Sequence, residues 1–261
     1  MTQKSGVIKT PAEKVAVLLQ ATFGNLEINT MFRTSMTSIL QSAARVCSFL
    51  LEIVLSQEPS RMQAETLISC VQVAASIEQK IWWDSKHLSR QIESIGPVKA
   101  DKLVAAGLTS YARLAESTSA RLEDILAQRP PAGLKMKQII AKWPKMSADI
   151  SFNADASNAT VTVSIDNPDT CDAVYRDHWV LIISLANDKS KGESTECHKL
   201  TPARQRFPMR FHLPTGGVFK TINVYFGSTT LVRACFVFCY PVAACYHATA
   251  RPCVSPLNIL P

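Results

Sequence analysis

The sequence contains none of the motifs that carry catalysis in the common ATPase and hydrolase classes. It has no G-x-x-x-x-G-K-[ST] loop to hold nucleotide phosphates, and no acidic motif that would mark a second phosphate-and-metal strand. The metalloprotease pattern H-E-x-x-H and the nucleophile pattern G-x-S-x-G are also absent. The histidines and cysteines are too scattered to indicate a Cys-His nucleophile pair. We therefore expect no catalytic residue and no cofactor in this chain.

Long apolar segments are missing as well. The first 14 residues lack the apolar core of a signal peptide, and the longest apolar run, 234–246, is interrupted by Pro241. The sequence thus predicts a soluble intracellular protein without membrane contact, whose 8 cysteines are reduced thiols. In the absence of a C-x-x-C knuckle, packing is favoured over metal binding for the C-terminal group of cysteines, Cys235, Cys239, Cys245 and Cys253.

The composition is that of a chain that folds, and its charge is unevenly distributed. The 261 residues are 47% hydrophobic and 19% charged, and the chain is long enough for two or three domains. The formal net charge is +7, and residues 86–145 hold 11 Lys and Arg against 5 Asp and Glu, a difference of +6. A local excess of this kind favours a polyanionic partner.

This basic segment contains a tight turn between two short predicted helices. In the turn Ser94-Ile95-Gly96-Pro97, Gly96 permits an unusual backbone angle and Pro97 suits the first position of a helix. Gly107 marks the end of that helix, and Thr109-Ser110 can cap the next one. The pattern predicts a helix-hairpin-helix unit, whose exposed backbone N–H groups can hold a phosphate.

The predicted nucleic-acid contacts follow from this turn. Backbone N–H groups after Gly96 would bind a phosphate, with lysine charge nearby and arginines at the margins. Such contacts position a strand without reading its sequence. Ser94 stands where many DNA-binding hairpins have glycine, so the alternative is a hairpin that only packs against the neighbouring helices. The candidate residues are Arg90, Gly96, Val98, Lys99, Lys102 and Arg113.

Helical periodicity precedes the turn, and strand-like alternation follows it. Three apolar stripes with three-or-four spacing occur before residue 85, and the first begins with a capping box at Thr10 and Glu13. Because the stripes are broad, we expect these helices to bury much of their surface in a compact bundle. From Asp149 onward, alternation predicts six or seven strands, with a buried central strand at 179–185, a polar loop at 187–194 and a final strand at 231–240.

The predicted fold class is therefore α+β and multidomain. It comprises an N-terminal helical bundle at 10–85, a helix-hairpin-helix domain at 86–146 and an immunoglobulin/fibronectin-like β-sandwich at 147–240. An irregular tail at 241–261 completes the chain, because four prolines are dispersed from Pro241 onward.

Four segments in and around the turn carry a family resemblance: Trp82, L-S-R-Q-I-E-S-I-G at 88–96, A-G-L-T-S-Y at 106–111 and L-E-D-I-L-A-Q-R-P-P-A-G at 122–133. They resemble the Sec-sixty-three-type homology module of superfamily-two helicases. The arginine, double proline and glycine that end the last segment are most similar to the meiotic crossover DNA helicases of the HFM or Mer-three type. Spliceosomal helicases of the Brr-two type are the next most similar, and the resemblance covers about residues 10–240.

The resemblance implies a non-catalytic accessory module of a nuclear, ATP-dependent DNA helicase that acts in meiotic homologous recombination. In that family the module sits against the motor domains, its hairpin domain contacts single-stranded or branched DNA, and its sandwich serves protein contacts. Because motor motifs are absent, we expect a fragment, split product or degenerate paralogue, with ATP and Mg²⁺ entering only through a parent motor. The alternative is a protein-interaction scaffold, related to spliceosomal or translocon-associated modules, that binds no nucleic acid.

Overall fold

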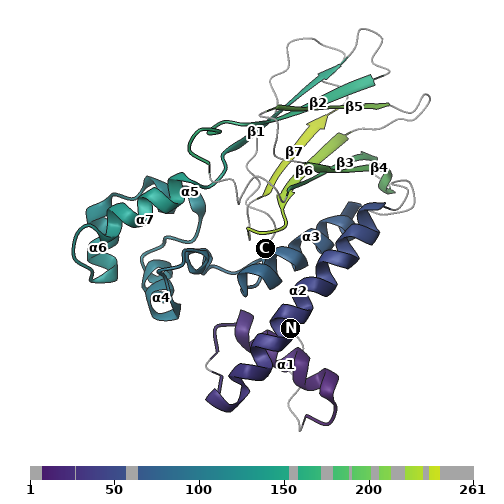
Figure 1. Cartoon of the computed structure of the whole chain (residues 1–261). Coiled ribbons are helices and arrows are strands. Elements are labelled where there is room, and N and C mark those ends of the chain that lie inside the picture. The colour runs from purple at the N-terminus through teal and green to yellow at the C-terminus, as the bar shows by residue number, and fades with distance from the viewer. Residues whose placement is uncertain are drawn as a thin grey trace.

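The computed structural model describes residues 8–26, 28–56, 64–152, 158–171, 179–187, 190–200, 206–212, 221–231 and 235–241. Within them, helices occupy the first part of the chain and antiparallel strands the second (Figure 1). This arrangement confirms the mixed helix-and-strand class predicted from the sequence.

The first helices form as the sequence predicts. In α1 (Pro11–Phe23), Thr10 Oγ1 accepts a hydrogen bond from the Glu13 N–H at 3.2 Å, and the Glu13 carboxylate accepts one from the Thr10 N–H at 3.2 Å. The two bonds satisfy donors that an uncapped helix would leave free. A short 3-10 helix, η1 (Thr30–Phe32), leads into α2 (Arg33–Ser56), and α3 (Ala64–Gln79) lies alongside α2.

The strands form two antiparallel sheets. In the first, β1 (Met146–Phe152), β2 (Asn158–Ile165) and β5 (Arg206–His212) follow the order β1-β2-β5. In the second, β4 (Ser190–Leu200), β3 (Trp179–Asn187), β6 (Thr221–Ser228) and β7 (Cys235–Pro241) follow the order β4-β3-β6-β7. In β2 every second residue is buried, which is the pattern of a strand with one face toward a core.

Strand β3 is the predicted buried central strand. All residues from Trp179 to Leu185 except Ser184 belong to the buried core, and Ser184 is itself only 7% exposed. Trp179 also stacks on Phe226 of β6, with ring centroids 4.5 Å apart and planes within 5°. Pairing with β4 on one side and β6 on the other satisfies its backbone, so both faces can be covered without loss of hydrogen bonds.

Two strand predictions are wrong in their bounds. The segment 187–194, predicted as a polar loop, contains the end of β3 and the start of β4. Because β4 lies at the edge of its sheet, polar residues there are compatible with a strand. The last strand begins at Cys235 rather than Leu231, because Ser228 Oγ accepts hydrogen bonds from the N–H groups of Thr230 and Leu231 and closes a turn.

Helix α3 joins the helical part to the four-stranded sheet. The end of α3 is held by Gln79, whose Nε2 donates to the carbonyl oxygen of Thr230 at 2.6 Å. A shared apolar cluster forms the rest of the contact, because side chains of α3 interleave with those of β3 and β6. Its buried members are Leu67, Val71, Val180, Ile182 and Tyr225.

Helix α2 departs from the expected compact bundle. Its inner side contributes Leu51, Val54 and Leu55 to the cluster shared with α3 and the sheet. Its outer side does not pack, because its main neighbours α1, η1, α3 and β4 leave that face uncovered. The expectation that the helices bury much of their surface is therefore wrong for the outer face of α2. The exposed stripe, at i, i+3, i+4 and i+7, consists of Val46, Phe49, Leu50 and Ile53, each 53–67% exposed.

One segment that includes α2 has the length of a membrane span. Thr30–Ser56, 27 residues, is long and apolar enough to cross a bilayer by length and composition. The expectation that the chain lacks an apolar segment long enough to span a bilayer is therefore wrong. Within α2 only Met36 is buried, and Leu51, Val54 and Leu55 are partly buried against α3 and the sheet.

After a four-residue 3-10 helix, η3 (Leu88–Gln91), come the short helices α4 (Pro97–Ala105), α5 (Tyr111–Glu116), α6 (Ser119–Leu126) and α7 (Ala132–Ala141). They enclose an apolar core of their own, in which Leu103, Leu114 and Leu122 are fully buried. Tyr111 packs edge-on against Trp143 at its border, with ring centroids 4.6 Å apart.

Helices α6 and α7 make close contact at Gly133. A Cβ atom at this position would lie 2.1 Å from the carbonyl oxygen of Ser119 in α6, closer than any real contact. The Gly133 N–H also donates to Glu123 Oε1 at 2.9 Å, which satisfies a free donor at the start of α7. Only glycine fits this position without moving one helix away from the other.

We predict that Gly133→Ala lowers the free energy of unfolding by about 2 kcal/mol, because the added methyl group forces α6 and α7 apart. Urea denaturation of the whole chain measures the change. Gly96→Ala is the matched control: nothing lies within 4 Å of a Cβ there, so its effect should stay within about 1 kcal/mol. Equal effects of the two substitutions would contradict the packing described here.

Candidate nucleic-acid interface

The predicted interface begins at the turn that precedes α4, and its backbone differs from the expectation. Gly96 is the N-cap residue of α4, with φ −82° and ψ 179°, an extended conformation open to any residue. The prediction that Gly96 supplies an unusual backbone angle is therefore wrong. A positive φ occurs at the other end of α4, where Gly107 has φ +79°. Before the turn, the first of the two predicted short helices is the 3-10 helix Leu88–Gln91.

The N-terminus of α4 is open. No side chain caps it; Pro97 has no N–H group, and the Ala100 N–H donates to the Gly96 carbonyl oxygen at 3.0 Å. In this fully described segment, the N–H groups of Val98 and Lys99 have no hydrogen-bond partner, as is usual in the first turn of a helix. The Val98 side chain is 72% exposed, so the surface around these two donors is accessible.

Two lysines follow on the same helix. Lys99 folds over the preceding turn, because its Nζ donates to the Ser94 carbonyl oxygen at 3.2 Å. Lys102 is exposed in the last turn of α4. Between them, Asp101 adds a negative charge and pairs through Oδ1 with His87 Nε2 at 2.9 Å. The structure thus brings Gly96, Val98, Lys99 and Lys102 together on α4, with one carboxylate among them.

Arg90 occupies a different environment from the lysines. It lies in η3 and is half-buried. Burial lowers the pKa of its guanidinium from the ordinary value, and the negative charge of Asp101 partly opposes this shift. A half-buried guanidinium is less accessible to an external ligand than the exposed side chain of Lys102.

Arg113 lies beyond the opposite end of α4. The helix ends as predicted at Gly107, whose N–H donates to the Val104 carbonyl oxygen, while the Leu108 N–H donates to that of Leu103, both at 2.9 Å. Arg113 Nη1 then donates to the Gly107 carbonyl oxygen at 2.9 Å. Nine helical residues span about 13 Å, so Arg113 and the turn before α4 do not form one cluster.

Ser110 caps α5 as the sequence indicates. Its Oγ accepts a hydrogen bond from the Arg113 N–H at 3.3 Å. The cap fixes the start of α5 only a few residues beyond Gly107, so the backbone of Arg113 is held close to the end of α4.

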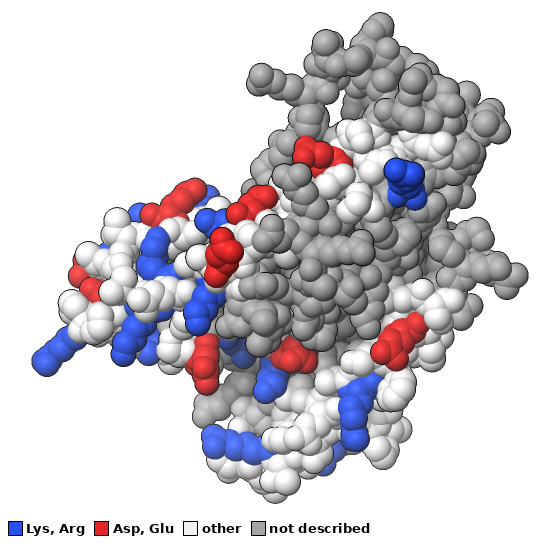
Figure 2. All heavy atoms as spheres, turned by 45° about the horizontal axis from the view of Figure 1, so that its top comes forward, with Lys and Arg blue, Asp and Glu red and all other residues white. Residues whose placement is uncertain are grey.

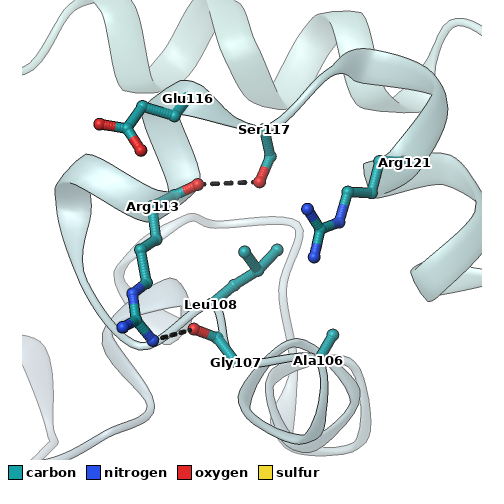
Figure 3. Close-up of a pocket in the computed structure, with 7 residues that line it drawn as sticks. All are labelled: Ala106, Gly107, Leu108, Arg113, Glu116, Ser117 and Arg121. Atoms are coloured by element: carbon teal, nitrogen blue, oxygen red, sulfur yellow. Dashed lines mark hydrogen bonds between the residues drawn. The ribbon is translucent and has the colours of Figure 1, made fainter.

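A hollow of about 330 Å³ opens beside Arg113, between the end of α4, α5 and α6 (Figure 3). Arg121 of α6 lies on its other side, with Leu108 between the two arginines. The sequence analysis did not single out Arg121. The signal that could have found it is the spacing of two arginines across the short link between α5 and α6, together with the turn at Gly107.

Basic side chains gather over the lobe formed by α4 to α7, as Figure 2 shows. Acidic side chains lie among them on the same face. On the face shown in Figure 2, the positive charge is therefore interspersed with acidic groups and does not form a single basic stripe. A polyanion would meet separate basic points on this face.

No cluster of three or more metal-ligating side chains occurs among the described residues. The structure places Cys235 and Cys239 in β7, and Cys245 and Cys253 lie outside the described residues. Cys47 and Cys70 are free thiols, and Cys171 is buried. Burial raises the pKa of Cys47 and of Cys70 above the ordinary thiol value, which disfavours the reactive thiolate.

The sequence of this chain also matches a known protein family. Residues 1–228 match the Sec63 Brl domain family, and the chain belongs to that family. This result confirms the Sec-sixty-three-type resemblance carried by the segments around the turn.

The relatives are much longer than this chain. The mouse protein named "Probable ATP-dependent DNA helicase HFM1" is 33% identical over 159 residues, which are 60% of this chain and 11% of that protein. Its human counterpart is 30% identical over 161 residues, 61% of this chain and 11% of that protein. The yeast "ATP-dependent DNA helicase MER3" is 21% identical over 219 residues, 81% of this chain and 18% of that protein. The chain thus spans less than a fifth of each of these helicases.

We predict that Arg90→Ala destabilises the protein by about 1 to 2 kcal/mol, because the packing of its half-buried side chain is lost. Lys102→Ala, at an exposed position on the same helix face as Lys99, should change stability by less than about 0.5 kcal/mol. Thermal and urea unfolding of both variants measure the difference. If Lys102→Ala were the more destabilising substitution, the division between packing and exposed cations drawn here would be wrong.

Proposed function

We propose that this chain is a non-catalytic accessory module of a meiotic-type, ATP-dependent DNA helicase, and that it contacts single-stranded or branched DNA. Its relatives are named as DNA helicases, and the chain corresponds to a small part of each. ATP and Mg²⁺ would enter only with the motor part of such a helicase. Action in homologous recombination and a nuclear location belong to the same proposal.

The observation that carries the proposal is the open N-terminus of α4. Two backbone donors, the N–H groups of Val98 and Lys99, lack partners at the positive end of a helix dipole. The open space beside Gly96 lets a bulky anion approach the backbone. Lys99 and Lys102 add charge that any phosphate would meet, so the contact would be independent of base sequence.

The proposal includes the finer architecture. Under it, η3, the turn and α4 form a helix-hairpin-helix unit within a domain at 86–146. The two antiparallel sheets form an immunoglobulin/fibronectin-like sandwich at 147–240, and α1 to α3 form the helical part at 10–85. Buried alternate residues in β2 and full burial along β3 support a sandwich, because each sheet has an apolar face to cover.

Protein contacts form the second part of the proposal. The sandwich is one predicted surface for a partner, and the structure offers another on α2. The exposed stripe of Val46, Phe49, Leu50 and Ile53 is apolar, on one face and more than half exposed. Contiguous apolar surface of this kind is typical of protein-protein contacts. The motor part of a helicase is the proposed partner, since most of the length of each relative lies outside the matched region.

The same stripe favours the second candidate function, a protein-interaction scaffold without nucleic-acid binding. In that case the turn before α4 only packs against its neighbours. The hydrogen bond from Lys99 to the Ser94 carbonyl oxygen then holds the ammonium group against the turn instead of against an external ligand. The two functions differ in a simple respect. The scaffold would have no measurable affinity for single-stranded DNA at physiological salt, whereas the DNA-contacting module would bind it measurably.

We predict that Lys99→Glu combined with Lys102→Glu weakens single-stranded DNA binding at least tenfold. The loss of two phosphate contacts should also reduce the slope of log K against log salt by about 1.4, because each single-strand contact contributes about 0.7. Fluorescence anisotropy with a labelled oligonucleotide over a series of salt concentrations measures both quantities.

The matched control is Lys135→Glu combined with Lys142→Glu, which makes the same change of charge at exposed positions in α7 and at its C-cap. It should weaken binding much less, because those lysines lie away from the start of α4. An equal loss in both double variants would show a response to net charge alone and would remove α4 as the contact. Absence of binding by the unmodified chain would favour the scaffold.

A further inference from the structure

The hollow beside Gly107 is a second basic feature of this chain, separate from the open N-terminus of α4. Its charged lining consists of Arg113 and Glu116 on α5 and Arg121 on α6. The two arginines approach it from opposite sides, with Leu108 between them (Figure 3). From these features we infer that the hollow binds a phosphate group, which in the function proposed above is a backbone phosphate of the DNA strand.

The two guanidinium groups have hydrogen-bond donors left for a ligand. Arg113 uses Nη1 to donate to the Gly107 carbonyl oxygen at 2.9 Å, which leaves its other N–H groups for a ligand. The side chain of Arg121 makes no hydrogen bond or ion pair within the described part of the chain. Guanidinium groups bind phosphate oxygens through two parallel hydrogen bonds, so this pair suits a phosphate better than two ammonium groups would.

Arg113 is also held in a fixed position. The positive φ of Gly107 closes the end of α4 and directs its carbonyl oxygen toward Arg113. Ser110 Oγ and Ser117 Oγ both bond to the Arg113 backbone, through its N–H at 3.3 Å and its carbonyl oxygen at 2.8 Å. A side chain that is already ordered loses less conformational entropy when a ligand arrives. The hollow is therefore partly organised before any ligand is present.

The other polar groups of the hollow limit what it can hold. Ser117 Oγ already donates to the Arg113 carbonyl oxygen, and Glu116 adds one negative charge to the lining. In Figure 3 the Glu116 carboxylate points away from Arg121. With two positive charges against one, the lining favours an anion, and a volume of about 330 Å³ lies at the lower end of small-ligand sites. One phosphate with its immediate substituents fits this description.

The hollow and the open N-terminus of α4 are close enough to contact the same strand. The two features lie at opposite ends of α4, whose nine residues span about 13 Å. One strand of duplex DNA rises about 3.4 Å per nucleotide along the helix axis, so this length corresponds to roughly four nucleotides of a stacked strand and to fewer of an extended one. This part of the inference rests on the proposed function: a single strand that contacts both ends of α4 would run along the helix. A phosphate bound without a strand would instead be that of a small molecule, such as inorganic phosphate or a mononucleotide.

The test uses Arg121→Gln, because no side-chain bond of Arg121 within the described residues would be lost with it. We expect this variant to bind a single-stranded oligonucleotide of about 12 nucleotides about tenfold more weakly than the unmodified chain, with a salt slope smaller by about 0.7. Arg121→Lys should restore the slope but not the full affinity, because it keeps the charge and loses the planar fork. Glu116→Gln should raise affinity about threefold, since it removes the opposing charge.

Arg129→Gln is the matched control, because Arg129 is exposed in the link between α6 and α7 and does not line the hollow. It should alter affinity less than twofold and leave the response to phosphate unchanged. In a second measurement, inorganic phosphate alone is titrated while the arginine side-chain N–H signals are followed by NMR. The signals of Arg113 and Arg121 should shift in the unmodified chain, and the Arg113 signal should stay unshifted in Arg121→Gln.

The outcomes separate this inference from the proposed function. If phosphate shifts neither arginine and Arg121→Gln binds DNA normally, the hollow is not a phosphate site, while the α4 contact can still stand. If phosphate shifts both arginines but Arg121→Gln leaves oligonucleotide affinity unchanged, the assignment to a backbone phosphate is overturned. If the unmodified chain binds no DNA but phosphate shifts both arginines, the proposed function fails and the hollow remains a site for a free phosphate-bearing molecule.

Discussion

The apolar core shared by α4 to α7 is the constraint on which the candidate interface depends. Leu103, Leu108 and Leu114 are buried in it, so the end of α4, the link and the start of α5 are fixed relative to one another. Every basic group considered above is attached to this core or to its margin. Cations on long side chains lose rotamer entropy when they bind, and a rigid base limits that loss to the side chains themselves.

A second set of bonds couples this core to the sheets. Asn167, in the turn after β2, donates through Nδ2 to the carbonyl oxygens of Ala141 and Trp143 at 3.3 and 2.9 Å, and its Oδ1 accepts from the Lys145 N–H at 2.7 Å. One side chain thus satisfies three backbone groups where α7 gives way to β1. Together with the packing of α3 on β3 and β6, it joins the helical part to the β part at two places.

The sequence was most informative where a single residue has one structural use. Thr10 and Glu13 predicted a capping box that the structure contains, and Gly107 predicted a helix end that only a residue tolerant of positive φ makes easily. The continuous apolar run from Trp179 predicted a strand covered on both faces, because a strand with one solvated face would alternate. In these cases local chemistry alone determines the structure.

Predictions from the sequence were wrong where the position of an element in the tertiary structure determines its burial or pairing. Strand β4 is polar because it lies at an edge, and its position at the edge depends on pairing with a distant strand. The apolar stripe of α2 has the spacing of a buried face, yet no described element covers it. For the candidate site, the sequence placed Lys99 and Lys102 on one helix correctly. It could not separate a half-buried Arg90 from exposed cations, or bring Arg121 beside Arg113, because both depend on how α4 to α6 pack.

The carboxylates among the basic groups affect how tightly such a module could bind a strand by itself. Asp101 lies between the two lysines of α4 and Glu116 beside Arg113, so each proposed phosphate contact has a carboxylate nearby. A few contacts weakened in this way would hold a strand loosely and release it readily as salt rises. Under the proposed function these contacts belong to a longer helicase, in which the strand is already close and effective concentration replaces intrinsic affinity. Weak binding then allows a strand that moves past the module to be guided at the ends of α4 without being trapped there.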